Sequence, residues 1–193
     1  EMYMYYYGTE VEEGFDAEGQ LTSAINHVVN DTAQKIYYTT GHGELAIGSS
    51  ITDLMKKSNY ATQEINTLMV TAIPEDCDLL FFYAPVTDLT EAEKTMVSTY
   101  MQGGGNVILV LGDGSKETPN LDALMVEYGM QMSKGYVADP SRSLQQNYEY
   151  VIPVLSLSGE MASGIQSEMV LLVYPRGMQT VTPARDTISV EEL

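Results

Sequence analysis

The chain has 193 residues, and acidic residues outnumber basic ones 27 to 9, which gives a formal net charge of −18. A surface of this charge repels phosphate backbones and anionic lipid headgroups, so we expect neither nucleic-acid binding nor direct adsorption to a membrane. The hydrophobic fraction of 44% is typical of a folded protein, and the single cysteine, Cys77, excludes an internal disulfide. Acidic neighbours on both sides of Cys77 disfavour a catalytic thiolate.

The chain begins with a segment that differs in composition from the rest. Residues 1–14 alternate tyrosine with methionine and then become acidic, which predicts an extended tether or edge segment. Residues 15–193 are expected to form a single α/β domain that becomes less regular from about residue 135. This domain is predicted to open with a helix that ends near residue 30, because apolar residues recur at helical spacing: Leu21, Ala24, Ile25, Val28 and Val29.

Strands and helices then alternate along the chain. The predicted strands are 35–40, 63–68, 78–84 and 107–111, and the predicted helices open near Ser50 (with Leu54 and Met55 on the buried side), Thr90 and Asn120. Thr90 and Glu93 have the spacing of a capping box. The connection between the second and third strands is too short for a full crossover helix, so we expect a tight turn there. Later apolar runs at 151–157, 169–174 and 178–190 predict a further strand or two on the same sheet.

This alternation is typical of an open, mostly parallel sheet with helices on both faces. Right-handed crossovers would bring the carboxyl ends of the strands to one edge, where ligands of such sheets bind. Two glycine-bearing bends follow strand ends, and glycine permits a positive φ and close approach of a ligand. The candidate ligand or partner site therefore comprises Thr40, Gly41, His42, Gly43, Glu44, Gly112, Asp113 and Gly114. Our favoured interpretation of residues 41–44 is structural, a turn whose histidine and glutamate orient the loop, rather than ligand binding.

The sequence is poor in motifs for ordinary enzyme chemistry. It contains no complete Gly-x-Gly-x-x-Gly pattern, no Walker loop and no Gly-x-Ser-x-Gly elbow. His42, Glu44 and Asp113 could supply metal ligands, but a transition metal normally requires more than one histidine or some thiolate. We therefore expect no metal, no cofactor and no catalytic residue.

Three linked segments carry a family resemblance: "KIYYTTGHGE", "LMKKSNYATQEINTL" and "IPEDCDLLFFYAPVTDLTEAEKTMVSTYMQGGGNVILVLGD". Over about residues 35–113 the chain resembles the extracytoplasmic domain of ABC-transporter auxiliary proteins of the gliding-motility type. The resemblance implies a flavodoxin-like or class I glutamine-amidotransferase-like three-layer sandwich without the amidotransferase's catalytic cysteine. It also implies a domain on the extracytoplasmic face of the bacterial cytoplasmic membrane, anchored by flanking helices absent from this chain. The implied partners are an ABC-2-type permease and ATPase.

These observations favour a non-catalytic auxiliary domain that binds a partner or substrate in export or surface assembly. Two alternatives from other classes stay open. One is a hydrolase acting on cell-surface glycan or peptide, with His42, Glu44 and Asp113 as acid–base groups. The other is a structural spacer or oligomerisation domain, so self-association is also left open.

Overall fold

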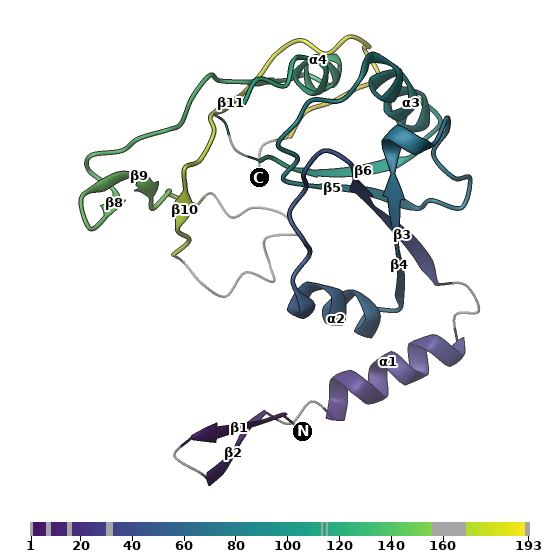
Figure 1. Cartoon of the computed structure of the whole chain (residues 1–193), viewed down its shortest axis with the longest axis vertical. Helices are drawn as coiled ribbons and strands as arrows, with labels where there is room; N and C mark the ends of the chain where they lie inside the picture. The colour runs from purple at the N-terminus through teal and green to yellow at the C-terminus, as the bar shows by residue number, and fades with distance from the viewer. Residues whose placement is uncertain are drawn as a thin grey trace.

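The computed structural model describes residues 2–6, 9–14, 17–29, 33–112, 114, 116–155 and 169–191. At its centre is a four-stranded parallel sheet in the order β4-β3-β5-β6 (Figure 1). The strands are β3 (Gln34–Thr40), β4 (Tyr60–Asn66), β5 (Leu79–Tyr83) and β6 (Asn106–Val110). A mixed α/β fold with a parallel sheet is therefore confirmed, whereas the specific flavodoxin-like or amidotransferase-like sandwich stays a prediction.

Helices α3 (Glu91–Gln102) and α4 (Pro119–Glu127) cover one face of this sheet (Figure 1). The predicted capping box opens α3: the Thr90 hydroxyl accepts from the Glu93 amide, and Glu93 accepts from the Thr90 amide. The main hydrophobic core lies between these helices and the sheet and is made of Tyr37, Ile65, Ile73, Cys77, Leu80, Phe82, Leu89, Met96, Val97, Leu121 and Leu124. Phe82, Leu80 and Val97 are almost completely enclosed, and they anchor the layer that positions the strand ends.

Helix α2 (Ser49–Lys57) lies on the opposite face and covers it only in part (Figure 1). The expectation that Leu54 is buried is wrong, since its side chain is 64% exposed and no residue of α2 is buried. The connection from β4 to β5 contains no second covering helix, as predicted, but it spans residues 67–78 and is longer than one tight turn; it opens with the 3₁₀ helix η1 (Thr67–Met69). Because little else packs on this face, Ile108 of β6 stays half exposed.

Two element boundaries differ from the predicted ones for local reasons. Strand β4 begins at Tyr60 rather than 63, directly after the positive φ of Asn59 ends the preceding turn. Helix α4 has Thr118 rather than Asn120 at its N-cap position, and Thr118 makes no side-chain cap bond; the amides of Asn120 and Leu121 donate to the Asp88 carboxylate instead. Asp88 thus ties the start of α4 to the loop that follows β5.

The described residues of the C-terminal third add no strand to the central sheet, so for them the expectation of further strands packing on that sheet is wrong. Its strands form two small antiparallel sheets, β11-β7 and β10-β9-β8. They are β7 (Met130–Met132), β8 (Ser143–Leu144), β9 (Asn147–Val151), β10 (Leu172–Val173) and β11 (Met178–Thr180). Gly129, with a φ of 85°, turns the chain after α4, and β7 pairs with β11 instead of with β6. Residues 156–168, which include part of one predicted strand, lie outside the described residues.

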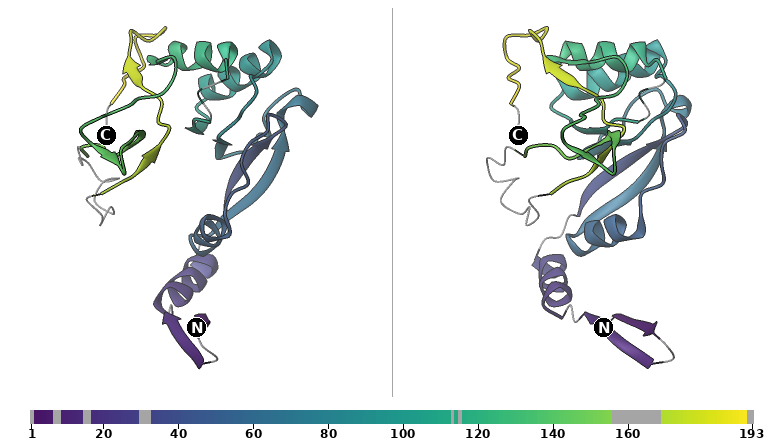
Figure 2. Two further views of the ribbon diagram at one scale, coloured as in Figure 1. Left: turned by 60° about the vertical axis from the view of Figure 1, so that its left-hand side comes forward. Right: turned by 90° about the vertical axis from the view of Figure 1, so that its left-hand side faces the viewer.

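The N-terminal hairpin of β1 (Met2–Tyr6) and β2 (Thr9–Gly14) and helix α1 (Ala17–Val29) lie at one end of the molecule, beyond α2 (Figures 1 and 2). The predicted helix is confirmed, but Leu21, Ile25, Val28 and Val29 on its apolar stripe are exposed. Within the described residues, no helix has the length and apolar character needed to cross a membrane. The division of the chain at residue 15 stays a prediction.

Candidate functional site

The two glycine-bearing bends meet at the carboxyl edge of the sheet, as the alternation of strands and helices predicts. Both β3 and β6 run parallel to β5 and are paired with it, so their ends flank the loop that follows β5. A Cβ added to Gly43 would lie 2.5 Å from Val86 Cγ2, and one added to Gly112 would collide with the Pro85 carbonyl oxygen. Both bends therefore close onto the same loop, residues 84–86, and their glycines are needed for that approach.

His42 lies inside this junction between two carboxylates. Its ring nitrogen Nε2 is 3.3 Å from Glu93 Oε2, and Nδ1 is 3.7 Å from Glu44 Oε1. The three side chains are only 2%, 4% and 5% exposed for His42, Glu93 and Glu44 respectively. The His42 backbone adds three bonds: its amide donates to Glu44 Oε2, and its carbonyl accepts from the amides of Val86 and Thr87. We call these three side chains the histidine cluster.

Glu93 links the histidine cluster to helix α3. Its Oε2 accepts from both the amide and the hydroxyl of Thr90, at 2.9 and 2.8 Å, and faces the His42 ring. Burial alone would raise the pKa of Glu93, but the polar groups of Thr67, Thr90 and His42 around the carboxylate outweigh it and hold the pKa below its ordinary value. The carboxylate form is thus the one that the folded protein stabilises.

The enclosure of the histidine cluster determines what it can do. Its side chains join the bend of residues 41–44 to the start of α3, while the His42 carbonyl holds the loop after β5, and the His42 side chain, at 2% exposed, is not accessible to a substrate. Of the other predicted site residues, Thr40 makes a long 3.4 Å bond to the Ile65 carbonyl, Gly41 packs against Asn66, and Asp113 lies outside the described residues. Within the part of the chain that the structure describes, no group of three or more metal-ligating side chains is placed to hold an ion. Ligand binding by the predicted set stays a prediction.

The lone cysteine is enclosed at the other end of β5. Cys77 is buried, and burial raises the pKa of its thiol. The Tyr100 hydroxyl donates to the Cys77 carbonyl oxygen at 3.1 Å, which fixes this segment against α3. These contacts describe a core thiol with low reactivity.

An open cavity of about 430 Å³ lies beside the sealed histidine cluster. It is lined by Leu45, Ala84, Leu111, Gly112, Tyr136, Val173 and Tyr174, and we call it the carboxyl-edge cavity. Its floor comes from the residues that follow β3, β5 and β6, and its roof comes from the C-terminal third. Leu45, which directly follows the predicted bend, is 59% exposed here. Gly112 is the one predicted site residue that lines it.

Two residues with positive φ and a group of aromatic rings lie at the carboxyl-edge cavity. Ala84 has a φ of 55° and Tyr174 a φ of 51°, values that residues with a side chain rarely adopt. Tyr174 packs against Tyr136 and Tyr150, with ring centroids 5.3 and 5.6 Å apart. Its amide donates to the Glu149 carbonyl, which holds the strained residue in place. Such strain is often stored where a protein binds its ligand.

The sequence analysis missed Leu45, Ala84, Tyr136 and Tyr174. For Leu45 a signal was present, because a large apolar residue directly after a predicted polar bend is out of place unless something covers it. For the two tyrosines no local signal exists. They reach the sheet edge only through the antiparallel pairing of β9 with β10 and the hydrogen bond from the Val137 amide to the Pro175 carbonyl.

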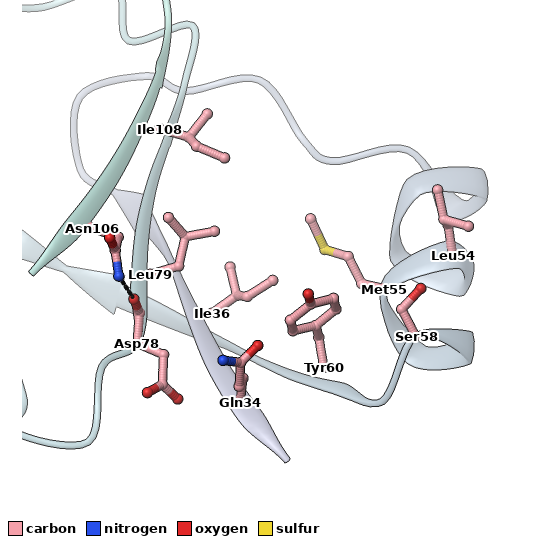
Figure 3. A pocket seen from close by; sticks show the side chains of 10 residues that line it. All are labelled: Gln34, Ile36, Leu54, Met55, Ser58, Tyr60, Asp78, Leu79, Asn106 and Ile108. Atoms are coloured by element: carbon pink, nitrogen blue, oxygen red, sulfur yellow. Dashed lines mark hydrogen bonds between the residues drawn. The ribbon is translucent and has the colours of Figure 1, made fainter. Parts of the chain in front are cut away.

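A second hollow, of about 490 Å³, lies at the opposite, amino edge of the sheet between the strands and α2. Figure 3 shows Ile36, Leu79 and Ile108 pointing from the sheet toward Met55 and Tyr60. Its polar rim includes Gln34, Ser58, Asp78 and Asn106. The side-chain Nδ2 of Asn106 donates to the backbone carbonyl of Asp78. We call it the amino-edge hollow. None of the predicted site residues lines it.

Comparison with known proteins gives a family and a fold. The family described as "ABC-type uncharacterized transport system" matches residues 33–152, which is more than half of the chain. A solved structure of the mmIFT52 N-terminal domain is similar, with a TM-score of 0.54 and 19% sequence identity; the match covers 77% of this chain and 69% of that one. At this identity the likeness concerns the fold alone. No curated protein sequence matches the chain.

Proposed function

Because the chain belongs to this family of ABC-type transport auxiliary proteins, we propose that it is a non-catalytic binding domain whose partner or substrate docks at the carboxyl-edge cavity. The histidine cluster supports the cavity instead of reacting: it fixes the bend of residues 41–44, and the His42 carbonyl in that bend holds the loop after β5 through the amides of Val86 and Thr87. Leu45 and Ala84 are thereby held at the rim.

The observation that carries this proposal is the combination of strain, aromatic packing and exposed apolar surface at one place. Two residues with positive φ, Ala84 and Tyr174, line the same cavity, together with an exposed leucine. A preorganised, apolar and aromatic surface is suited to binding, because little conformational entropy is lost when the ligand arrives. The ligand class that fits is a peptide segment or substrate with an apolar face.

The proposed setting is the extracytoplasmic face of the bacterial cytoplasmic membrane, beside an ABC-2-type permease and its ATPase. Two features support it: membership of a transport family, and a net charge of −18 that keeps the domain off anionic lipid. In intact cells that make the full-length protein, a membrane-impermeant maleimide should label Leu54→Cys, whereas the buried Cys77 of the unsubstituted protein stays unlabelled. Labelling only after the cells are broken would place the domain on the cytoplasmic side.

The binding proposal is tested with two matched leucines, one at each edge of the sheet. Leu45 and Leu54 are 59% and 64% exposed, so Leu45→Glu and Leu54→Glu should both leave the fold intact. Leu45→Glu places a charge in the carboxyl-edge cavity, and we expect it to abolish co-purification with the cognate permease and to reduce transport output. Leu54→Glu should leave both unchanged. If Leu45→Glu retains both properties while Leu54→Glu loses them, the binding surface is the amino-edge hollow and the proposal fails.

A further inference from the structure

Basic side chains are scarce in this acidic chain, yet they converge at one cavity. Of its nine lysines and arginines, three line a cavity of about 350 Å³: Lys116, Lys134 and Arg176. The cavity lies beside the start of α4, on the far side of Gly114 from the carboxyl-edge cavity, and its lining also includes Gly114, Glu117, Thr118, Pro119, Asp122 and Gly135. We call it the basic cavity.

Arg176 is the central group of the basic cavity. Its side chain is only 9% exposed, and its Nε is buried without a hydrogen-bond partner among the described residues. Its one ion pair is loose, with Nη2 at 3.9 Å from Asp122 Oδ1. A guanidinium has five donors, and a buried one normally has them satisfied. The described residues therefore leave most of the binding capacity of Arg176 unused.

The surrounding backbone holds Arg176 and Lys134 side by side. The Ser133 amide donates to the Gly177 carbonyl at 2.8 Å, and the Val137 amide donates to the Pro175 carbonyl at 2.7 Å. These two bonds bracket Arg176 and the turn that carries Lys134. From the other side, Gly114 lets the arginine stem lie flat, because a Cβ there would be 3.0 Å from its Cγ and Cδ.

The two lysines of the basic cavity are exposed, and neither makes an ion pair or hydrogen bond with the described residues. Most other basic side chains are committed elsewhere: Lys35 to Asp76, Lys94 to Glu91, and Arg185 to Glu127. The acidic side chains in the lining are Glu117 and Asp122, and the Thr118 hydroxyl donates to Asp122, which leaves that carboxylate partly satisfied. Among the described residues of the lining, three basic and two acidic side chains give a positive balance in a chain of net −18.

We propose that the basic cavity binds an oxyanion, the phosphate or carboxylate group of a charged ligand. Arg176 would contact two of its oxygens, since the planar guanidinium matches that geometry, and Lys116 and Lys134 would add charge from the open side. An anion would accept hydrogen bonds from the buried guanidinium, whose ion pair with Asp122 is long at 3.9 Å. The site is separate from the carboxyl-edge cavity, so this inference does not depend on the proposed function.

The test is a titration of the purified chain with inorganic phosphate and, separately, with acetate, at constant ionic strength maintained with sodium chloride. Backbone amide chemical shifts in NMR spectra report the binding. We expect saturable shifts at Gly114, 116–118, Lys134 and Arg176, and none on α2. Saturation by phosphate alone identifies a phosphate group, saturation by acetate alone identifies a carboxylate, and saturation by both identifies a general oxyanion site.

Two exposed lysines make matched variants. Lys134→Ala removes one charge from the basic cavity and should weaken phosphate binding by up to about fivefold. Lys56→Ala, on α2, removes the same charge elsewhere and should leave the affinity unchanged. Arg176→Gln should abolish saturation, with its fold checked by the unchanged amide spectrum of β3 to β5. The proposal is overturned if no saturable shift occurs with either anion, or if Lys56→Ala weakens binding as much as Lys134→Ala.

Discussion

The two edges of the central sheet differ in how their hollows are held. At the carboxyl edge, buried hydrogen bonds and close glycine contacts fix three loops, and the open cavity lies on top of that rigid junction. At the amino edge, the hollow lies under α2, a helix with no buried residue, and one residue of its apolar floor, Ile108, is half exposed. The comparison teaches that the conspicuous Gly-His-Gly-Glu sequence holds loops together, whereas the open surface belongs to its less conspicuous neighbours.

The largest effect is expected from the histidine cluster. His42→Ala would leave Glu44 and Glu93 enclosed without the imidazole between them, and we expect it to lower the free energy of unfolding by about 2–4 kcal/mol. His42→Gln keeps a donor near Glu93 and should cost less. Urea denaturation measures the free energy of unfolding of both variants. An His42→Ala variant as stable as the unsubstituted chain would mean that the carboxyl edge is no more firmly held than the amino edge.

The next effect concerns glycine contacts. Gly112→Ala would force its methyl group against the Pro85 carbonyl and the Ala84 backbone, at an expected cost of about 2 kcal/mol. Gly48→Ala, at the start of α2, meets no atom within 4 Å and should cost at most about 1 kcal/mol. Thermal unfolding compares the pair. Equal losses of stability in the two variants would show that the loop after β5 can move to accommodate the methyl group, which would contradict a rigid carboxyl edge.

Acid should remove the contribution of Glu93 to the stability of the carboxyl edge. The pKa of Glu93 is lowered in the folded state from its ordinary 4.5, so the stability it contributes is complete above that value and is lost as the pH falls through the folded-state pKa. Glu93→Gln lacks this titration. The difference in unfolding free energy between the unsubstituted chain and Glu93→Gln should therefore shrink as the pH drops below 4.5. If this difference in unfolding free energy does not change with pH, Glu93 does not contribute to the pH dependence of stability.

The smallest effect is expected at the amino edge. Ile108→Thr keeps the β-branched shape, and the side chain is already half exposed, so the cost should stay below about 1 kcal/mol. Urea denaturation under the conditions used for His42→Ala gives the direct comparison. A loss as large as that of His42→Ala would show that something covers Ile108 in solution, and the contrast between the edges would disappear.

Local signals predicted the parts of the fold that local interactions determine. The capping box at Thr90 and Glu93 gave the start of α3, and apolar runs gave β3, β5 and β6 to within a residue or so. The exposure of α2 could not be predicted, because the apolar stripe of a helix assumes a packing partner, and the β4–β5 connection supplies no second helix on this face.

The meeting of the two bends was predicted, and the lining of the carboxyl-edge cavity only in part, whereas ligand binding there stays a prediction. Parallel strands bring the two bends to one edge by topology alone, so their meeting at residues 84–86 followed from the strand order. The roof of the carboxyl-edge cavity and the pairing of Lys134 with Arg176 depend on contacts between residues about 40 positions apart in the chain, as in the bond from Ser133 to Gly177. No periodicity in the sequence encodes such contacts.

The double role of Glu93 has a consequence for local opening of the protein. The same carboxylate oxygen accepts from Thr90 at the start of α3 and faces His42, whose carbonyl accepts from the amides of Val86 and Thr87. Fraying of the first helical turn would therefore release the loop after β5 as well. In native-state hydrogen exchange, the amides of Val86, Thr87 and Thr90 should consequently exchange with a common opening free energy, as one cooperative unit.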